Sequence, residues 1–511
     1  TTPKPRSVDR LGLLGGSERG SAFWLGELEC RSPDCSRYQK ALRVKLHDGW
    51  SRATPVFDDE HLVSCAGLVP VMGLAERSGL AELIDQRVRF VTSRVASAGV
   101  NPAGKLTAVI AGMAAGADCL DDLDLLRSGG MPALFAGVYA PATLGQHLRE
   151  FTYGHTRQLT SVLAAHLVNL VNTTGLLPGI SRQVFIDIDS LLRPTFGHAK
   201  QGASYGHSKI AGKQVLRKGL SPLVTTLSTP AGAPVIAGIR LRAGRAGSGK
   251  GAASMVTEAI TVARACGASG EVLVRGDSAY GSSQVVAACR RAGARFSVVL
   301  TKNPAVTRAI NTIPDDAWTP VRYPGAVVDP ETGEWISDAE VAEIPAFTAF
   351  ASTKQPVTAR LIVRRVRDRA RLDELFPVWR HHPFLTDSVE PAPAADITHR
   401  RHAIIETTFA DLIDGPLAHL PSGRFAANGA WTICAAISHN LLRAAGTMAG
   451  PAEAVARGAT LRRTLINVPA RIARPQRRPM LHLPAHWPWA KPWLTLWGRI
   501  LGNDLPPPVP A

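Results

Sequence analysis

One short segment of the chain constrains the fold and the chemistry more than any other. Residues 183–190 read Q-V-F-I-D-I-D-S, a run of β-branched and aromatic residues that ends in two acids. This composition predicts a buried strand, and strand alternation places Phe185, Asp187 and Asp189 on one face of it. Because a buried, unpaired carboxylate is costly, a divalent cation near the end of the strand would account for the acids. An acidic strand end that faces solvent is the alternative interpretation.

The charge and the cysteine content narrow the partners and the compartment. The formal net charge is +17 and the isoelectric point is about 10.0, so a polyanionic partner is expected, with DNA or RNA ahead of a membrane. The seven cysteines are scattered and odd in number, which predicts no disulfide framework and fits a reducing cytoplasm. Cys30 and Cys35 lack a second Cys or His pair nearby, so no zinc site is expected. The sequence shows no signal peptide and no long uncharged apolar run, which predicts a soluble protein without a membrane partner.

Changes in residue pattern predict an α/β protein with several parts. Helical spacing of apolar residues before the acidic strand predicts an all-helical domain. This domain would bind DNA or mediate dimerisation, with a purely structural packing domain as the alternative. After that strand, a hairpin pattern and alternating helices and strands predict a mixed sheet with parallel crossovers. The C-terminal arginines and tryptophans predict a basic arm on DNA, with a packed strap as the alternative. The expected parts are a poorly ordered tail (1–54), the helical domain (55–180), the first part of the α/β core (181–301), a β-rich insertion (302–395), the second part of the core (396–447) and the basic arm (448–511).

Two further acids lie at predicted elements of the core, one directly after a strand and the other on a helix. Asp277 comes directly after the strand V-L-V-R-G, at the strand end where ligands of open α/β sheets bind. Glu406 lies on a helix predicted to begin at Asp396, one residue from Ile405 in its buried stripe. Taken alone, Glu406 has the position of an ordinary solvated helix acid.

Basic residues in two places predict contacts to a nucleic acid. Arg364, Arg365 and Arg367 lie close together in a predicted strand of the insertion, which suits a phosphate backbone, although a solvated charged face is the alternative. The segment 244–250 matches the phosphate-binding pattern G-x-x-x-x-G-K, but Gly251 stands where a nucleotide-binding loop has Ser or Thr. We therefore expect Lys250 to contact a DNA phosphate, and we do not expect nucleotide binding.

Several sequence blocks together resemble the DDE transposases, and most closely the insertion-sequence thirteen-eighty family. The resemblance runs from about Pro55 to Gly498. Its blocks are D-I-D-S, G-H-A-K-Q-G-A-S-Y-G, V-L-V-R-G-D-S-A-Y-G, G-A-R-F-S-V-V-L-T-K-N-P-A-V and H-A-I-I-E-T-T-F-A-D-L-I-D-G-P-L-A-H-L-P-S-G-R-F, in this order. The resemblance implies a ribonuclease-H-like mixed sheet flanked by helices. It also implies that Asp189, Asp277 and Glu406 are the catalytic residues and hold two Mg²⁺ ions, with Mn²⁺ as the alternative metal.

The implied function is cleavage of the ends of an insertion sequence and their joining to target DNA. The partners would be double-stranded DNA and a second copy of the chain in a homodimeric synaptic complex, associated with the bacterial nucleoid. A ribonuclease-H-like nuclease that does not join strands, and an inactive DNA-binding relative, are the alternatives.

The family pattern also directs attention to the residues around Glu406 and Asp189. Related transposases often carry a Tyr-Arg-Glu-Lys signature, whose Tyr, Arg and Lys places are held here by His399, His402 and Ile413. We expect His402 and the neighbouring Arg400 and Arg401 to contact DNA. Of the two strand acids, Asp189 lies nearer the strand end and is expected to bind metal. Asp187 is expected to support it from deeper in the sheet.

Overall fold

A computed structural model describes residues 47, 49–91, 98–210, 213–247, 249–322, 328, 330–331, 333, 339–367 and 378–502. The chain forms two compact units, residues 1–58 and 59–511. The first unit contains a 3₁₀ turn at Trp50–Arg52, and the remainder of the predicted tail up to residue 46 lies outside the described residues. The description below concerns the second unit.

A nine-stranded mixed sheet forms the centre of this unit, and β2 (Gln183–Ser190) is one of its inner strands. β2 runs parallel to β8 and antiparallel to β6, and β8 runs parallel to β9. This confirms the predicted mixed α/β sheet, with its meander and its parallel crossovers. The order is β10-β11-β12-β13-β9-β8-β2-β6-β7. The other strands are β6 (Leu223–Thr229), β7 (Gly232–Arg240), β8 (Glu271–Gly276), β9 (Arg295–Val299), β10 (Thr319–Pro320), β11 (Ala339–Ala349), β12 (Val357–Arg367) and β13 (Trp379–Thr386).

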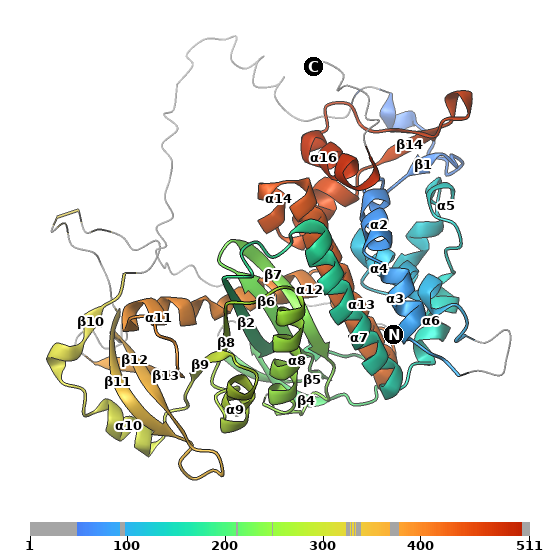
Figure 1. Cartoon of the computed structure of the whole chain (residues 1–511). Coiled ribbons are helices and arrows are strands. Elements are labelled where there is room, and N and C mark those ends of the chain that lie inside the picture. The colour runs from blue at the N-terminus through green and yellow to red at the C-terminus, as the bar shows by residue number, and fades with distance from the viewer. Residues whose placement is uncertain are drawn as a thin grey trace, which may run out of the picture. The chain divides into compact units, whose positions relative to one another are not determined.

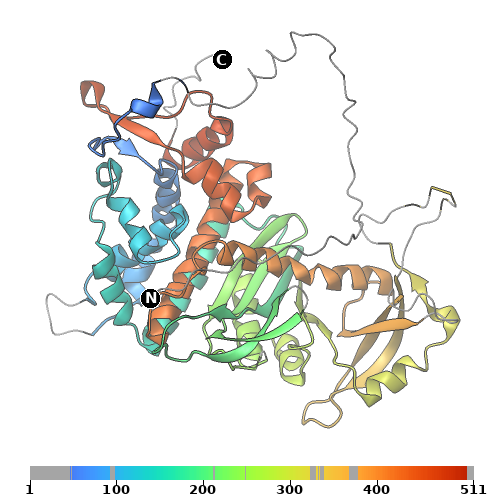
Figure 2. The ribbon, with the colours of Figure 1, turned by 180° about the vertical axis from the view of Figure 1, so that it is seen from behind.

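Helices cover both faces of the sheet. α8 (Ala252–Ala265) and α9 (Ser283–Arg291) lie on the face turned to the viewer in Figure 1. α11 (Ala392–Arg400) and α12 (Ile405–Ile413) cross the opposite face, which Figure 2 shows. The alternation of β2 explains both layers, since its even-numbered apolar residues face one layer and its acids face the other.

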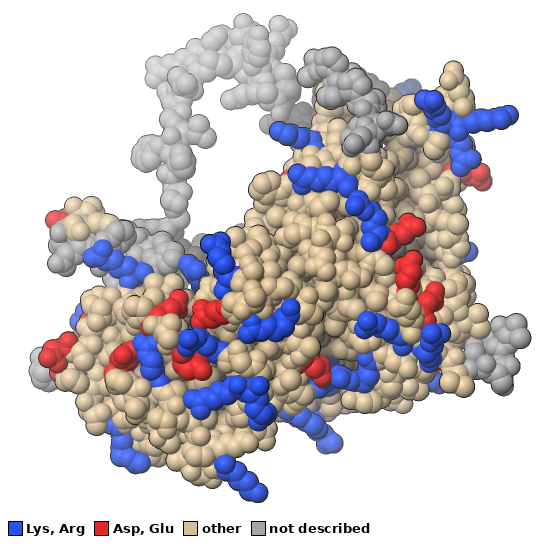
Figure 3. All heavy atoms as spheres, in the orientation of Figure 1, with Lys and Arg blue, Asp and Glu red and all other residues tan. Residues whose placement is uncertain are grey.

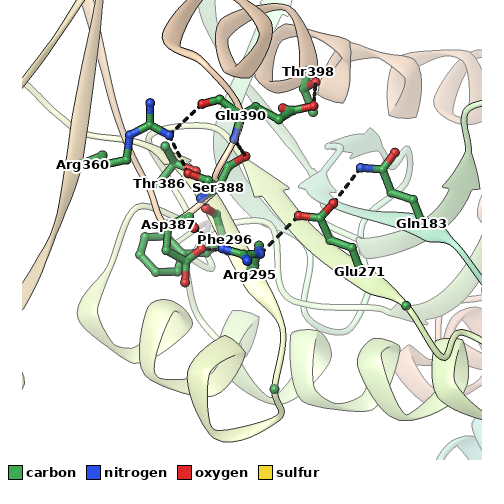
Figure 4. Close-up of polar contacts among 12 residues, drawn as sticks. Gln183, Glu271, Arg295, Phe296, Arg360, Thr386, Asp387, Ser388, Glu390 and Thr398 are labelled. Carbon is green, nitrogen blue, oxygen red and sulfur yellow. Dashed lines mark hydrogen bonds and ion pairs between the residues drawn. The ribbon is translucent and has the colours of Figure 1, made fainter. Parts of the chain in front are cut away.

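The predicted β-rich insertion contains strands β10 to β13, and these strands extend the core sheet because β13 pairs antiparallel with β9. Figure 4 shows the polar contacts at this junction. The Thr386 hydroxyl donates to the Phe296 carbonyl at 2.8 Å, and the Phe296 amide donates to Asp387 Oδ1 at 2.8 Å. Arg295 pairs with Glu271 at 3.3 Å. The insertion is thus continuous with the part of the sheet that contains β8 and β2.

The N-terminal part of this unit is helical, as predicted, and α13 (Phe425–Ala449) joins it to the sheet. This almost fully buried helix contacts α4, α7 and β7. No helix among the described residues is both long and apolar enough to cross a bilayer. The N-terminal helices are α2 (Leu68–Arg77), α3 (Leu80–Arg87), α4 (Pro102–Ala115), α5 (Met131–Leu134), α6 (Pro141–Arg149) and α7 (Tyr153–Thr174).

The described part of residues 448–511 is packed on the helical domain, so the prediction of a basic arm was wrong there. α16 (Ala490–Leu501) contacts α2 and α13, and it buries Trp493, Leu496 and Ile500. β14 (Ala470–Ala473) pairs with β1 (Leu62–Val63) near the start of the unit. The spacing of the three apolar residues of α16 places them on one helix face, which explains the packing. The short elements between α13 and α16 are α14 (Pro451–Val455), α15 (Gly458–Leu461), a π-helical turn (Arg462–Ile466) and β15 (Met480–His482).

A second, three-stranded sheet lies in the chain between β2 and β6. Its strands are β3 (Arg193–Pro194), β4 (Ser204–Ile210) and β5 (Lys213–Leu220), in the order β3-β5-β4. The sequence patterns did not predict this sheet, because its strands lack the apolar alternation of a half-buried strand.

Candidate active site

The parallel pairing of β2 and β8 brings two acids to the same level of the sheet. In the ladder, Asp187 is opposite Arg275 and Ile188 is opposite Gly276. Asp189 and Asp277 are the next residues of the two chains, so they lie side by side at the carboxyl ends of neighbouring parallel strands. The local backbone orients both carboxylates. Asp189 Oδ1 accepts from the Ser190 amide at 2.6 Å, and Asp277 Oδ1 accepts from the Ala279 amide at 2.9 Å.

Glu406 is brought to these acids by a broken helix. The helix predicted to begin at Asp396 begins at Ala392, directly after Pro391, and a 3₁₀ turn at Arg401–Ile404 separates α11 from α12. Pro393 lies in the first turn, where a helix tolerates proline, which explains the earlier start. Glu406 is exposed in the first turn of α12, beside the buried Ile405.

Asp189, Asp277 and Glu406 line one cavity of about 1080 Å³. Among the described residues, the one group of three potential ligands within 4.8 Å of one another is Asp118, Cys119 and Asp122, which lie apart from this cavity. The three predicted acids are therefore spaced more widely than a single ion held by all of them requires. Two-metal sites hold their ions about 3.5–4 Å apart, and such a pair needs a wider set of ligands.

The carboxylates of the cavity repel one another. Burial, and next the charges of Asp277 and Glu406, raise the pKa of Asp189 to about 7. A cation among the three side chains would relieve this repulsion. The three acids offer carboxylate oxygens, which are the ligands that Mg²⁺ prefers. The residues thus fit the predicted metal chemistry.

Asp187 is held in a buried ion pair below the cavity. Arg275 donates to both of its carboxylate oxygens, at 2.7 and 2.8 Å, and both side chains are 1% exposed. The guanidinium also donates to the Thr398 carbonyl of α11 at 2.8 Å and lies over the Phe185 ring at 4.2 Å. Asp187 and Arg275 therefore fasten β2, β8 and α11 together. This placement agrees with the supporting role expected for Asp187, which stays a prediction.

The three arginines of β12 do not form the single basic surface that we expected. Arg364 and Arg365 point to opposite faces because neighbouring strand residues alternate. Arg365 Nε donates to Glu340 at 2.5 Å, and its guanidinium lies over the rings of Trp318 and Trp379 at 4.3 and 4.4 Å. Arg367 is exposed at the end of the strand. Arg365 thus has partners within the protein.

The other predicted DNA contacts lie in different surroundings. Burial and the nearby charges of Arg364, Lys302 and Arg400 lower the pKa of His382, so Arg364 and Arg400 lie near the same histidine. Arg401 is exposed on the 3₁₀ turn. His402 lines the cavity, whereas the exposed Lys250 does not.

The C-terminal arginines differ in their surroundings. Arg462 is 7% exposed and donates to the Asp414 carbonyl at 3.1 Å, whereas Arg474 and Arg477 are exposed. On the face shown in Figure 3, Lys and Arg are scattered among Asp and Glu. The C-terminal arginines therefore do not all lie on one exposed surface.

Two of the three positions that depart from the family signature, those of His399 and Ile413, have different surroundings. His399 is buried, forms a 2.8 Å hydrogen bond with the Ser297 hydroxyl, and stacks on Phe384 at 4.2 Å. Its burial holds the pKa of its imidazole well below the ordinary value, so the ring is neutral. Ile413 lines the cavity.

Sequence reasoning missed a further part of the cavity wall. The small sheet contributes Tyr205, His207 and Arg217, and the glycine-rich segment 244–247 contributes Arg245. Both segments had drawn attention in the sequence, one as a family block and the other as a false nucleotide loop. Neither pattern shows that they meet, because their pairing is long-range.

Comparisons with known proteins identify related sequences. A family model described as transposase DDE domain group 1 matches residues 51–502. Among solved structures, the chain is similar to the piggyBac transposase in a synaptic complex with hairpin DNA, with 11% identity and a TM-score of 0.38. That similarity covers 78% of this chain and 79% of the piggyBac chain. No curated protein matches the sequence.

Proposed function

Because the chain belongs to the transposase DDE domain group 1 family, we propose that it cleaves the ends of its own insertion sequence and joins them to target DNA. The observation that carries this proposal is the register of β2 and β8, which places Asp189 beside Asp277. Glu406 lines the same cavity from α12. Three acids distant in sequence thus share one solvent-filled space, as two-metal phosphoryl transfer requires.

Asp189, Asp277 and Glu406 would hold two Mg²⁺ ions, with Mn²⁺ as the alternative. Bound metal supplies activation of the attacking oxygen and stabilisation of the leaving oxygen in an in-line displacement at phosphorus. The chain itself orients the ligands. The Ser190 and Ala279 amides fix two of the carboxylates, and α12 presents the third.

The substrate we propose is double-stranded DNA, at the element ends and at the target site. A water molecule attacks first, and a DNA 3′ hydroxyl attacks in the joining step, so no covalent link between protein and DNA is required. We place the chain in the insertion-sequence thirteen-eighty family, acting as a homodimer in a synaptic complex on nucleoid DNA in the cytoplasm. The sequence blocks around the three acids support this finer assignment.

The experiment needs the natural DNA ends, which the inverted repeats flanking the gene provide. The full chain would be incubated with Mg²⁺, a labelled duplex that carries one repeat, and a supercoiled target plasmid. We expect cleavage at the repeat and labelled plasmid products, and neither with Asp277→Asn. Cleavage without joined products would favour the nuclease alternative. Absence of both in Mg²⁺ and in Mn²⁺ would overturn the proposal.

A further inference from the structure

The part of the cavity wall formed by the small sheet and residues 243–247 has no assigned role, and it carries an inference that rests on the proposed function. We propose that the small sheet β3-β5-β4 and residues 243–247 hold the phosphate backbone of the DNA strand in the cavity. Arg217 and Arg245 are the positioning residues. This wall and the three acids line the same cavity, so a strand bound there can contact both.

The wall is a built structure in which backbones touch. Ala243 forms a β-bridge with Leu220, at the end of β5. A Cβ atom on Gly206 would lie 2.2 Å from the Gly244 carbonyl oxygen, and one on Gly244 would lie 2.3 Å from the Gly219 carbonyl oxygen. Only glycine permits contacts this close. The segment 243–247 is therefore docked on the small sheet.

Arg242 fastens the base of this segment. Its guanidinium donates to the Ser221 carbonyl at 3.2 Å and to the Lys250 carbonyl at 3.1 Å, and the residue is 7% exposed. On the far side of the turn, the Arg245 amide donates to the Ser204 hydroxyl at 2.8 Å. Arg242 is thus occupied in holding the wall, and Arg245 is held so that its side chain lies at the cavity.

The two positioning arginines differ from the other arginine of the cavity. Arg217 and Arg245 are exposed and line the cavity, and their guanidinium groups have no hydrogen-bond or ion-pair partner in the part of the chain that the structure describes. Arg193 also lines the cavity, but it donates to the Ala418 carbonyl at 2.9 Å. A guanidinium group without a protein partner is suited to bidentate contact with phosphate.

The arrangement of charge favours a DNA strand over a free nucleotide. Carboxylates alone would repel a phosphodiester. Arg217 and Arg245, which line the same cavity, offset that repulsion. The exposed ring of Tyr205 adds an apolar surface for a sugar or base. Lys250, which a nucleotide loop would direct at phosphate, does not line the cavity. The volume of about 1080 Å³ exceeds the usual size of a small-molecule site.

The test compares Arg217→Ala and Arg245→Ala with Arg127→Ala, a surface arginine paired with Asp124 at 2.6 Å outside the cavity. Affinity of the full-length proteins for a labelled terminal-repeat duplex would be measured across a salt series. Each cavity variant should bind about tenfold more weakly, since a charge-assisted hydrogen bond is lost. The slope of log affinity against log salt should fall by about 1 for each arginine. Arg127→Ala should match the wild type.

A second set of measurements separates positioning from folding. Melting temperatures should be unchanged, and the substrate concentration for half-maximal cleavage should rise more than the maximal rate falls. Arg217→Lys and Arg245→Lys keep the charge and should restore part of the affinity. Wild-type affinity and salt slope in both alanine variants, with a wild type that cleaves DNA, would overturn this inference alone. A wild type that neither binds nor cleaves DNA would overturn the proposed function together with it.

Discussion

At the scale of the residue, the two acids of β2 lie in different surroundings, and we expect different roles for them. Asp187 faces Arg275 in a bidentate pair, whereas Asp189 lines the cavity beside Asp277. Alternation alone could not separate them, since both lie on the same face of the strand. Their depth along the strand, and the partner that each one meets across the ladder, provide the distinction.

Exchanging each acid for its amide tests this distinction. Asp189→Asn should abolish cleavage and joining while DNA binding is kept, because the amide retains the shape but loses the charge that holds metal. Asp187→Asn should retain measurable activity but lower the free energy of unfolding by about 3 kcal/mol, because Arg275 loses its buried counter-charge. Cleavage assays and thermal melting of both variants would decide. An inactive Asp187→Asn with wild-type stability would contradict the assignment.

Arg365 was expected to contact DNA, and its surroundings predict a different result. The side chain is 14% exposed, pairs with Glu340 and lies over two tryptophans. Arg365→Ala should therefore lower the free energy of unfolding by about 1–2 kcal/mol through lost cation–π and ion-pair contacts. The salt slope of DNA binding should stay at the wild-type value. A smaller slope with unchanged melting temperature would return Arg365 to the DNA interface.

At the scale of the element, the contact between the segment 243–247 and the small sheet β3-β5-β4 helps to determine the shape of the cavity. Gly244→Ala would place a Cβ atom 2.1 Å from the Ser204 carbonyl oxygen, so the segment must move away from β4. We expect weaker DNA binding and slower cleavage, because Arg245 moves with the segment. Gly154→Ala, on α7 and outside the cavity, is the matched control, since the nearest atom to a Cβ atom there is the Thr152 hydroxyl oxygen at 3.6 Å, an ordinary van der Waals contact. Equal affinities and rates for the two variants would show that the docked segment does not shape the site.

At the scale of the whole molecule, the sequence predicted what depends on local pattern and missed what depends on distant pairing. The apolar run before Asp187 predicted β2, and the strand before Asp277 predicted its parallel neighbour. The pairing of β13 with β9 joins segments separated by most of the insertion, and no local pattern indicates it. Arg365 illustrates the same limit, because Trp318 and Trp379 reach it from two different parts of the chain.

The free energy of unfolding at acid pH is a property of the whole molecule, and it depends in part on buried histidines. His166 on α7 is fully buried, and its Nε2 lies 2.9 Å from the hydroxyl of Ser78, which follows α2. Burial lowers the pKa of His166 from 6.5 to about 4. Between these pH values the unfolded chain binds a proton that the folded chain does not. The contribution of neutral His166 to the free energy of unfolding is therefore complete above pH 6.5 and is lost as the pH is lowered towards 4.

His166→Gln removes this titration while keeping a polar side chain. Between pH 7 and pH 4, the wild type should lose about 3 kcal/mol more stability than His166→Gln, because one pKa unit corresponds to about 1.4 kcal/mol. His482→Gln, at an exposed position on β15, should follow the wild type. Urea unfolding of the three proteins at several pH values measures the difference. Parallel pH curves for the wild type and His166→Gln would show that folding leaves the pKa of His166 unchanged, because only a proton taken up on unfolding makes the curves diverge.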